Sequence, residues 1–324
     1  MPEFMLLSNS FSPGQGALEH AMDELAILFA GAQNVLFVPY AASDPDGYTD
    51  AMQAALGSMG VQVVGAHLTA DPLTALVQAD AVFVGGGNAF RLLRAVQRNG
   101  LLSAIGPRVR AGLPYLGVSA GANLACPTIR TTNDMPVVQP ASLAALGLVP
   151  FQVNPHYPVA DLYDGQPRQA RDRRLEEFLE ENDVPVLGLC EGSWLRVSGA
   201  RAALGGTAGG RVFTRGESPR DVQPGDDLTR LLDTRPHFDS PTRLPTRKYR
   251  AAADGSRDGP GRDLLSDLRR MSGLVRQYAD LRLGGTDASV VAICERFGIV
   301  TVATVNLRDF AASPPSGRAI FPRS

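Results

Sequence analysis

The chain has 324 residues, of which 44% are hydrophobic and 20% are charged, and its formal net charge at pH 7 is −2. This apolar content suffices for one good-sized domain with room for a small second one, and it excludes a disordered chain. The near-neutral charge gives no bulk electrostatic basis for binding nucleic acid, and three widely separated cysteines indicate neither a disulfide framework nor a zinc site.

The first two thirds of the chain alternate short apolar runs with segments of helical periodicity. Because the apolar runs show no polar alternation and are separated by helices, they indicate a doubly wound, mostly parallel α/β sheet covered on both faces. Strands are predicted at residues 4–7, 35–38, 61–66, 81–84, 114–118, 186–189, 194–197 and 202–204, and helices at 17–30, 48–59, 88–97 and from 120 onward.

The composition changes near residue 226. The chain then becomes rich in Pro, Arg, Asp and Gly and loses its apolar period, which is typical of a linker, before helical periodicity returns. We therefore expect a main domain at residues 1–238, a linker at 239–262 and a small α/β fragment at 263–324.

The segment Gly117-Val118-Ser119-Ala120-Gly121 lies between a predicted strand and a predicted helix and fits the G-x-S-x-G pattern of a nucleophile elbow. Such a turn holds the serine in a strained backbone conformation, and small neighbours avoid clashes with the adjoining strand and helix. The helix N-terminus behind the serine favours negative charge on a substrate oxygen. Ser119 is therefore the predicted nucleophile.

A serine nucleophile needs a base, and the chain has four histidines. His20 lies in the first predicted helix, His67 follows a predicted strand, and His237 lies close to the predicted linker. His156 stands in the rigid segment Asn154-Pro155-His156-Tyr157-Pro158 after an apolar run. Such a loop can project an imidazole over the carboxyl edge of a parallel sheet, where α/β active sites collect, so His156 is the predicted base.

Two carboxylates are candidates for orienting the base. Asp134 follows a polar loop after the nucleophile helix, whereas Glu191 follows the predicted strand at 186–189 and stands near Trp194, the only tryptophan. Asp134 also fits a role in a turn or as a helix cap. The local patterns alone leave both assignments open.

The run Gly85-Gly86-Gly87-Asn88 ends a predicted strand and opens a predicted helix. Glycines there let backbone N–H groups point at a ligand, so the N–H groups of Gly87 and Ala120 are the predicted oxyanion hole, and Asn88 is a predicted substrate contact. The run lacks the Lys-Ser/Thr of a P-loop and the spacing of a dinucleotide site. We expect no cofactor and no metal in the main domain.

The chain has separated segments at residues 6–10, 85–88, 117–136, 154–156 and 191–192 that follow one another in a fixed order. Together they resemble the peptidase E family over roughly residues 5–226. The resemblance implies a fold like that of the class I glutamine amidotransferases. It also implies the hydrolysis of Asp-Xaa dipeptides after an N-terminal aspartate, by a serine mechanism with an acyl-enzyme intermediate.

The same resemblance implies roles for individual residues. On the matching positions Ser119 is the nucleophile, His156 the base and Asp134 the acid, with Glu191 as its rival. Arg171 matches a family stretch that bears arginines, and a guanidinium suits the carboxylate of an N-terminal aspartate. Gln and Ala precede Arg171 where the family has Glu and Thr. The implied partner is a small peptide, with neither nucleic acid nor membrane, and the implied assembly is a monomer or homodimer.

The C-terminal fragment resembles a different family. Its segments at 278–281, 286–289 and 303–310 are similar to the last third of a PIN-type nuclease, in which carboxylates gather around a divalent metal. Asp287 fits one of these carboxylates, but Asn306 stands where an acid is common, and no N-terminal PIN strand is present. A fused remnant is therefore favoured over an active nuclease.

Several alternatives to a serine dipeptidase remain open. A different Ser-His hydrolase could use the same scaffold, with cyanophycinase-like or esterase activity. A metal-dependent RNase, or a toxin–antitoxin-like binding module, would place the function in the C-terminal fragment, and EDTA separates the RNase from a serine enzyme. The N-terminus lacks a basic leader and no window approaches the ~20 apolar residues of a membrane span, so we expect a cytoplasmic protein.

Overall fold

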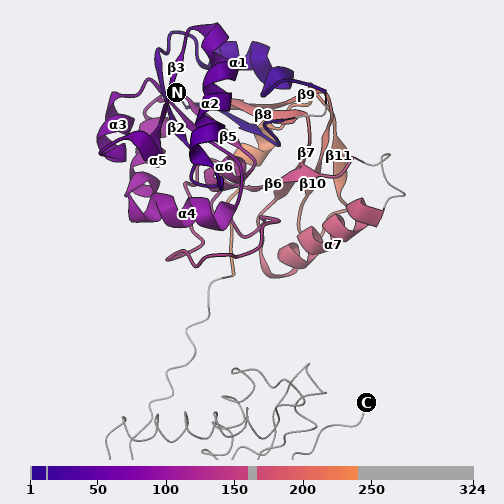
Figure 1. The fold of residues 1–324 in the computed structure, drawn as a ribbon. Coiled ribbons are helices and arrows are strands. Elements are labelled where there is room, and N and C mark those ends of the chain that lie inside the picture. The colour runs from indigo at the N-terminus through magenta and orange to yellow at the C-terminus, as the bar shows by residue number, and fades with distance from the viewer. Residues whose placement is uncertain (1, 12–13, 160–165, 240–324) are drawn as a thin grey trace, which may run out of the picture. The chain divides into compact units, whose positions relative to one another are not determined.

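The computed structural model of the chain describes residues 2–11, 14–159 and 166–239 (Figure 1). The predicted C-terminal fragment, with Asp287 and Asn306, lies outside the described residues, and so does the predicted linker beyond residue 239. Within the described ranges, no helix has the length and apolar character needed to cross a membrane.

A seven-stranded sheet forms the centre of the described chain (Figure 1). Its strands span Glu3–Leu7 (β1), Asn34–Val38 (β2), Gln62–Gly65 (β3), Ala81–Val84 (β4), Tyr115–Val118 (β5), Ser193–Ser198 (β8) and Arg201–Gly206 (β9). They are ordered β3-β2-β4-β5-β1-β8-β9, and the first five are parallel, whereas β8 and β9 extend the sheet in antiparallel fashion. The predicted doubly wound, mostly parallel sheet is therefore confirmed.

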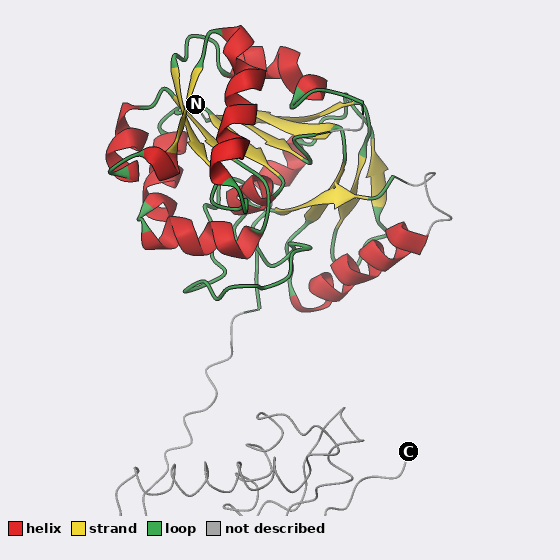
Figure 2. Cartoon of the chain, viewed as in Figure 1, coloured by secondary structure: helices red, strands yellow, loops and turns green. Residues whose placement is uncertain are grey.

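Helices cover both faces of this sheet (Figure 2). Strand β1 shows why its sequence lacks polar alternation: Met5 and Leu7 are buried on one face and Phe4 and Leu6 on the other. The first face packs against α1 (Met22–Leu28) and α2 (Pro45–Leu56), and the second against α3 (Pro72–Gln78), α4 (Ala89–Arg98), α5 (Leu101–Arg110) and α6 (Ala120–Ala125). Short 3-10 helices span Glu19–Ala21, Gly57–Met59, Ala66–Leu68 and Thr229–Asp233.

A second, four-stranded sheet was not predicted from the sequence. Its strands span Gln152–Tyr157 (β6), Val186–Cys190 (β7), Gly210–Phe213 (β10) and Arg220–Val222 (β11), in the order β11-β10-β7-β6. Helix α7 (Gln166–Glu181) packs on it through Leu175 and Leu179. Only β7 was expected, because β10 and β11 are short and bear arginines, and Pro155 argues locally against a strand in β6.

Candidate active site

The predicted nucleophile elbow joins β5 to α6. Ser119 follows β5 directly and has φ 51° and ψ −107°, a positive-φ conformation that residues with side chains rarely adopt. A side chain at Gly121 would overlap the Val84 carbonyl of β4, and one at Gly117 would come within 2.6 Å of the Gly121 carbonyl oxygen. The two glycines therefore allow the close approach of strand and helix that this turn requires.

His156 lies at the end of β6, where the pairing with β7 shifts register between Asn154 and Tyr157. His156 itself has φ 54°, and its side chain is exposed. The imidazole Nε2 lies 2.9 Å from the Ser119 Oγ, within the hydrogen-bond reach that a general base needs. The structure thus brings the predicted nucleophile and the predicted base together.

Glu191 follows β7, and its Oε1 lies 2.7 Å from the Nδ1 of His156. An ionised carboxylate only accepts hydrogen bonds, so Nδ1 carries the proton and Nε2 presents its lone pair to Ser119. The side chains of His156 and Glu191 are 43% and 55% exposed, which leaves the pair open to substrate and water. The three side chains have the connectivity of a Ser-His-acid triad.

Asp134, which the family resemblance favoured as the acid, occupies a different place. Its Oδ2 accepts hydrogen bonds from the backbone N–H of Ala89 at 2.7 Å and from the Thr132 hydroxyl at 3.0 Å. Ala89 is the first residue of α4, so the carboxylate satisfies a donor at the positive end of that helix. Of the two candidates, the geometry therefore favours Glu191 as the acid that orients His156, because Glu191 contacts the base and Asp134 caps α4.

Gly87 and Ala120, the predicted oxyanion donors, both stand beside the nucleophile. Gly87 has φ 126°, and a side chain there would overlap the Ala41 carbonyl, so this position requires glycine. Ala120 follows Ser119 as the first residue of α6, where backbone N–H groups have no partner within the helix. Both backbones are therefore available to a substrate oxygen near Ser119.

Asn88 is a structural residue in this arrangement. Its Oδ1 accepts hydrogen bonds from the backbone N–H groups of Phe90 and Arg91 and thereby caps α4. Its Nδ2 donates to the Met135 carbonyl at 2.8 Å. Both ends of the amide are engaged, so Asn88 caps α4 and tethers the loop bearing Asp134, and its role as a substrate contact stays a prediction.

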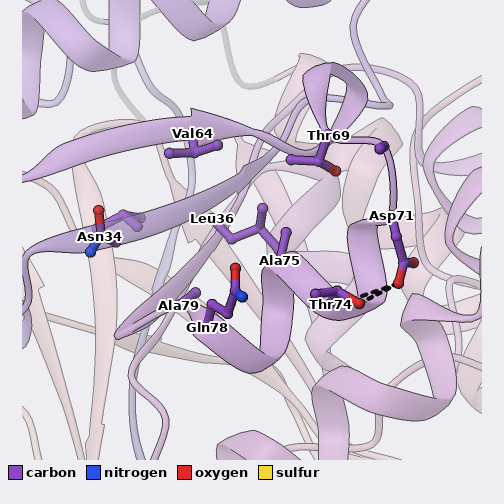
Figure 3. A pocket seen from close by; sticks show the side chains of 11 residues that line it. Asn34, Leu36, Val64, Thr69, Asp71, Thr74, Ala75, Gln78 and Ala79 are labelled. Carbon is purple, nitrogen blue, oxygen red and sulfur yellow. Dashed lines mark hydrogen bonds between the residues drawn. The ribbon is translucent and has the colours of Figure 1, made fainter.

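A cavity of about 330 Å³ opens at the candidate triad. Ser119, His156 and Gly87 line it together with Phe11 and Tyr48, among others. A larger cavity of about 520 Å³ lies between β2, β3 and α3 and contains none of the predicted site residues (Figure 3). The smaller cavity is the one in which a bound peptide would meet the nucleophile.

Arg171, on α7, lies against the segment that carries the base. Its Nη1 donates to the Asn154 Oδ1 at 2.9 Å and lies 3.4 Å from the His156 carbonyl oxygen. Burial of the guanidinium, together with the nearby Arg174 charge, holds the pKa of Arg171 below its usual value. Within the described part of the chain no carboxylate pairs with Arg171.

Three residues at the site were given no role from the sequence, although Ser8 and Asn9 belong to a segment that carries the family resemblance. The Tyr48 hydroxyl accepts a hydrogen bond from the Gly86 N–H at 3.0 Å. Ser8 and Asn9 follow β1 directly and accept hydrogen bonds from the backbone N–H groups of His156, in β6, and of Gly192, next to Glu191. The sequence pattern that could have identified Ser8 and Asn9 is a polar run immediately after a buried apolar strand. A similar position after a strand marked Gly85 to Asn88.

The thiols in the described part of the chain are not activated. Burial raises the pKa of Cys126 to about 12 and the pKa of Cys190 to about 11. Both therefore stay protonated at neutral pH, whereas a nucleophilic cysteine must reach its thiolate form. Ser119 is the better candidate nucleophile.

Comparison with known proteins gives a consistent result. The profile described as "Peptidase family S51" matches residues 4–205. The chain is 55% identical over 239 residues to "Peptidase E" of Streptomyces coelicolor, covering 74% of this chain and 98% of that protein. It is 45% identical over 226 residues to "Peptidase E" of Salmonella typhimurium, covering 69% and 98%. The crystal structure of a peptidase from an acI-B1 Actinobacterium shares the fold, with 17% identity, a TM-score of 0.51 and coverage of 70% and 96%.

Proposed function

The chain belongs to peptidase family S51 and is a serine-type dipeptidase, and we propose that it hydrolyses dipeptides with an N-terminal aspartate, Asp-Xaa. The observation that carries the mechanism is the chain of hydrogen bonds from Ser119 through His156 to Glu191 at the cavity. The aspartate preference rests on Arg171, which lies against the segment bearing His156, and on the similarity to proteins named Peptidase E.

Acylation would begin with attack of the Ser119 Oγ on the carbonyl carbon of the substrate aspartate. His156 Nε2 takes the hydroxyl proton, while Glu191 stabilises the imidazolium through Nδ1–H. The negative charge that forms on the carbonyl oxygen is directed at the N–H groups of Gly87 and Ala120. His156 then returns the proton to the amine of the leaving residue, and the peptide C–N bond breaks.

Deacylation repeats the same proton path with water. The aspartyl ester on Ser119 is attacked by a water molecule that gives its proton to His156 Nε2. Collapse of the second tetrahedral intermediate breaks the ester bond, and His156 returns the proton to the Ser119 Oγ. Because the pair of His156 and Glu191 is partly exposed, water has direct access to the ester.

Recognition of aspartate requires a cation near the nucleophile. A carboxylate removed from water must be paired, since an unpaired buried charge costs several kcal/mol. Arg171 offers a planar fork that suits a carboxylate. It stands on α7 with its Nη1 3.4 Å from the His156 carbonyl oxygen, and it carries no carboxylate partner within the described residues.

The test is a panel of dipeptides given to the full chain. Asp-Leu should be cleaved at least about 100-fold faster, in kcat/KM, than Leu-Leu or Glu-Leu, with no effect of EDTA, because no step needs a metal. β-Asp-Arg serves as the control for a cyanophycinase-like activity on isopeptide bonds. Equal rates on Leu-Leu and Asp-Leu, or cleavage of β-Asp-Arg alone, would remove the proposed specificity.

A further inference from the structure

A run of three polar residues, Ser8 to Ser10, directly follows β1, and together with Leu7 it contacts each segment of the candidate triad. Ser8, Asn9 and Ser10 are only 0%, 3% and 7% exposed. Buried polar side chains are costly unless they form hydrogen bonds, so their partners reveal their roles. The strand itself is joined to the elbow, because the Ser119 N–H donates to the Leu7 carbonyl at 2.9 Å.

Ser8 bridges the strands that carry the base and the acid. The register shift between Asn154 and Tyr157 leaves the His156 N–H and the Leu189 carbonyl outside the regular ladder of β6 and β7. The Ser8 hydroxyl stands between them: its Oγ accepts from the His156 N–H at 2.8 Å and donates to the Leu189 carbonyl at 2.9 Å. One side chain thus replaces the missing ladder bond and fixes His156 in its positive-φ conformation.

Asn9 holds the turn that carries the acid. Its Oδ1 accepts a hydrogen bond from the Gly192 N–H at 2.8 Å, and Gly192 directly follows Glu191. Its Nδ2 donates to the Phe11 carbonyl at 2.7 Å, which orients the amide so that the oxygen faces Gly192. Asn9 therefore sets where the Glu191 backbone leaves β7.

Ser10 reaches the predicted oxyanion loop through Tyr48. The Ser10 Oγ and the Tyr48 Oη are 2.7 Å apart, and the Tyr48 Oη also accepts from the Gly86 N–H at 3.0 Å. Burial raises the pKa of Tyr48, so its hydroxyl stays neutral and able to donate. The position of Gly86 therefore also fixes that of Gly87, its neighbour.

We propose that the segment Leu7–Ser10 is a template, in the sense that its hydrogen bonds fix the relative positions of the nucleophile, the base, the acid and the glycine loop. Within this template, Ser8 is a positioning residue for His156. Four consecutive residues hold four segments that are far apart in the sequence. This inference rests on the proposed function for its triad. It does not depend on the aspartate specificity.

The first test compares Ser8→Ala with Ser193→Ala in the full chain. Both remove a fully buried serine hydroxyl, but the Ser193 hydroxyl has no hydrogen-bond partner within the described residues. Ser8→Ala should lower kcat about 10- to 100-fold with KM within about 2-fold, because the base is misplaced while substrate binding persists. Ser193→Ala should resemble the wild type. Wild-type turnover by Ser8→Ala would overturn the proposal.

The second test separates positioning from general destabilisation. In the Glu191→Gln background, Ser8→Ala should cause little further loss of kcat, because the triad that Ser8 positions has already lost its acid. An equal fold-loss in both backgrounds would contradict a positioning role. If Ser8→Ala does not fold, Ser8→Cys carries the same comparison, since a thiol keeps a weak donor and acceptor there.

Two substrates distinguish the proposed template from the proposed aspartate specificity. Rates on p-nitrophenyl acetate follow the triad without requiring an aspartate, so the Ser8 comparison is made on this ester as well as on Asp-Leu. A wild-type chain that cleaves the ester but not Asp-Leu counts against the proposed function alone. A Ser8→Ala protein with wild-type rates on the ester counts against the template alone.

Discussion

Ser119 and His156 are two of the three non-glycine residues with positive φ in the described part of the chain. Such conformations cost on the order of 1–3 kcal/mol each and persist only where the surroundings enforce them. Gly117 and Gly121 enforce the first, and the Ser8 hydroxyl enforces the second. Strain at the nucleophile and at the base therefore has separate structural causes, which separate variants can test.

Replacement of the nucleophile should abolish turnover without unfolding the chain. Ser119→Ala should lower kcat on Asp-Leu by about 10⁴-fold or more, because the acyl-enzyme cannot form, and His156→Ala should be nearly as damaging. Circular dichroism and the thermal midpoint establish that each variant is folded. A folded Ser119→Ala protein with near-normal turnover would exclude the serine mechanism.

Matched carboxylate-to-amide changes should separate the two acids. Glu191→Gln should lower kcat about 10²- to 10⁴-fold, because the amide no longer enforces the imidazole tautomer. Asp134→Asn keeps an oxygen near the Ala89 N–H and loses only the charge at the helix terminus, so it should cost about 1 kcal/mol of stability or less, with kcat nearly unchanged. Kinetics and urea unfolding of both proteins decide, and the opposite ranking of kcat would restore Asp134 as the acid.

Arg171 should determine the preference for an N-terminal aspartate rather than the rate of the chemical steps. Arg171→Ala should lower kcat/KM on Asp-Leu roughly 30- to 5,000-fold, because the aspartate carboxylate loses its partner. This corresponds to a loss of about 2–5 kcal/mol of transition-state stabilisation. Rates on p-nitrophenyl acetate should persist, and Arg171→Lys should rescue only partly, since a point charge replaces a fork. Arg173→Ala, on an exposed position of the same helix, is the matched control. Equal losses on both substrates would point to misfolding.

How far the sequence could predict the site differs from residue to residue. The elbow was predictable because its glycines, serine and flanking elements are contiguous. The acid was not, because Asp134 and Glu191 both follow plausible local patterns and only the fold decides which one reaches His156. The role of Ser8 was even harder to predict from the sequence, since its partner His156 lies 148 residues away.

Individual elements were predictable where both faces are buried. Strands β2, β4 and β5 are continuous apolar runs, and their observed bounds lie within a residue of the predicted ones. The second sheet was not predictable in this way, because its shortest strand, Arg220–Val222, has only one buried residue and exists through its pairing with β10. Long-range pairing rather than local pattern defines those strands.

The tight contact between β4 and α6 gives a prediction for the elbow. Gly121→Ala would place a methyl group on the Val84 carbonyl, so α6 must shift, and stability should fall by about 3 kcal/mol or more with loss of activity. Gly57→Ala is the control, because Gly57 has φ −60°, is exposed and meets only the end of the Gln53 side chain. That change should be neutral or stabilise by up to about 1 kcal/mol. Equal thermal midpoints of the two variants would refute the packing argument.

On the scale of the whole molecule, the candidate triad spans both sheets. Ser119 directly follows β5 of the main sheet, whereas His156 lies in β6 and Glu191 directly follows β7 of the smaller sheet. Strand β1 lies in the main sheet, and Ser8 and Asn9, which follow it, are hydrogen-bonded to His156 and Gly192. A variant that loosens one sheet from the other should therefore affect catalysis before global unfolding.

The last described residues pack against the rest of the described chain. Near the end of the described chain, His237 exchanges two backbone hydrogen bonds with Asp183, and the Phe238 ring packs against Phe178 and the Arg130 guanidinium. All residues proposed for the site precede this point, and the alignment with the Streptomyces coelicolor relative covers 98% of that protein in 239 residues. We therefore expect residues 1–239 to contain the complete catalytic unit.

A protein ending at residue 239 should therefore fold and cleave Asp-Leu with kcat/KM within about 2-fold of the full chain, because no proposed catalytic group is removed. A protein ending at residue 226 is the matched control. It loses the His237 pairing and the Phe238 packing, so its thermal midpoint should fall clearly, as expected for removal of buried contacts. Folding without dipeptidase activity in the 239-residue protein would show that residues 240–324 contribute to catalysis.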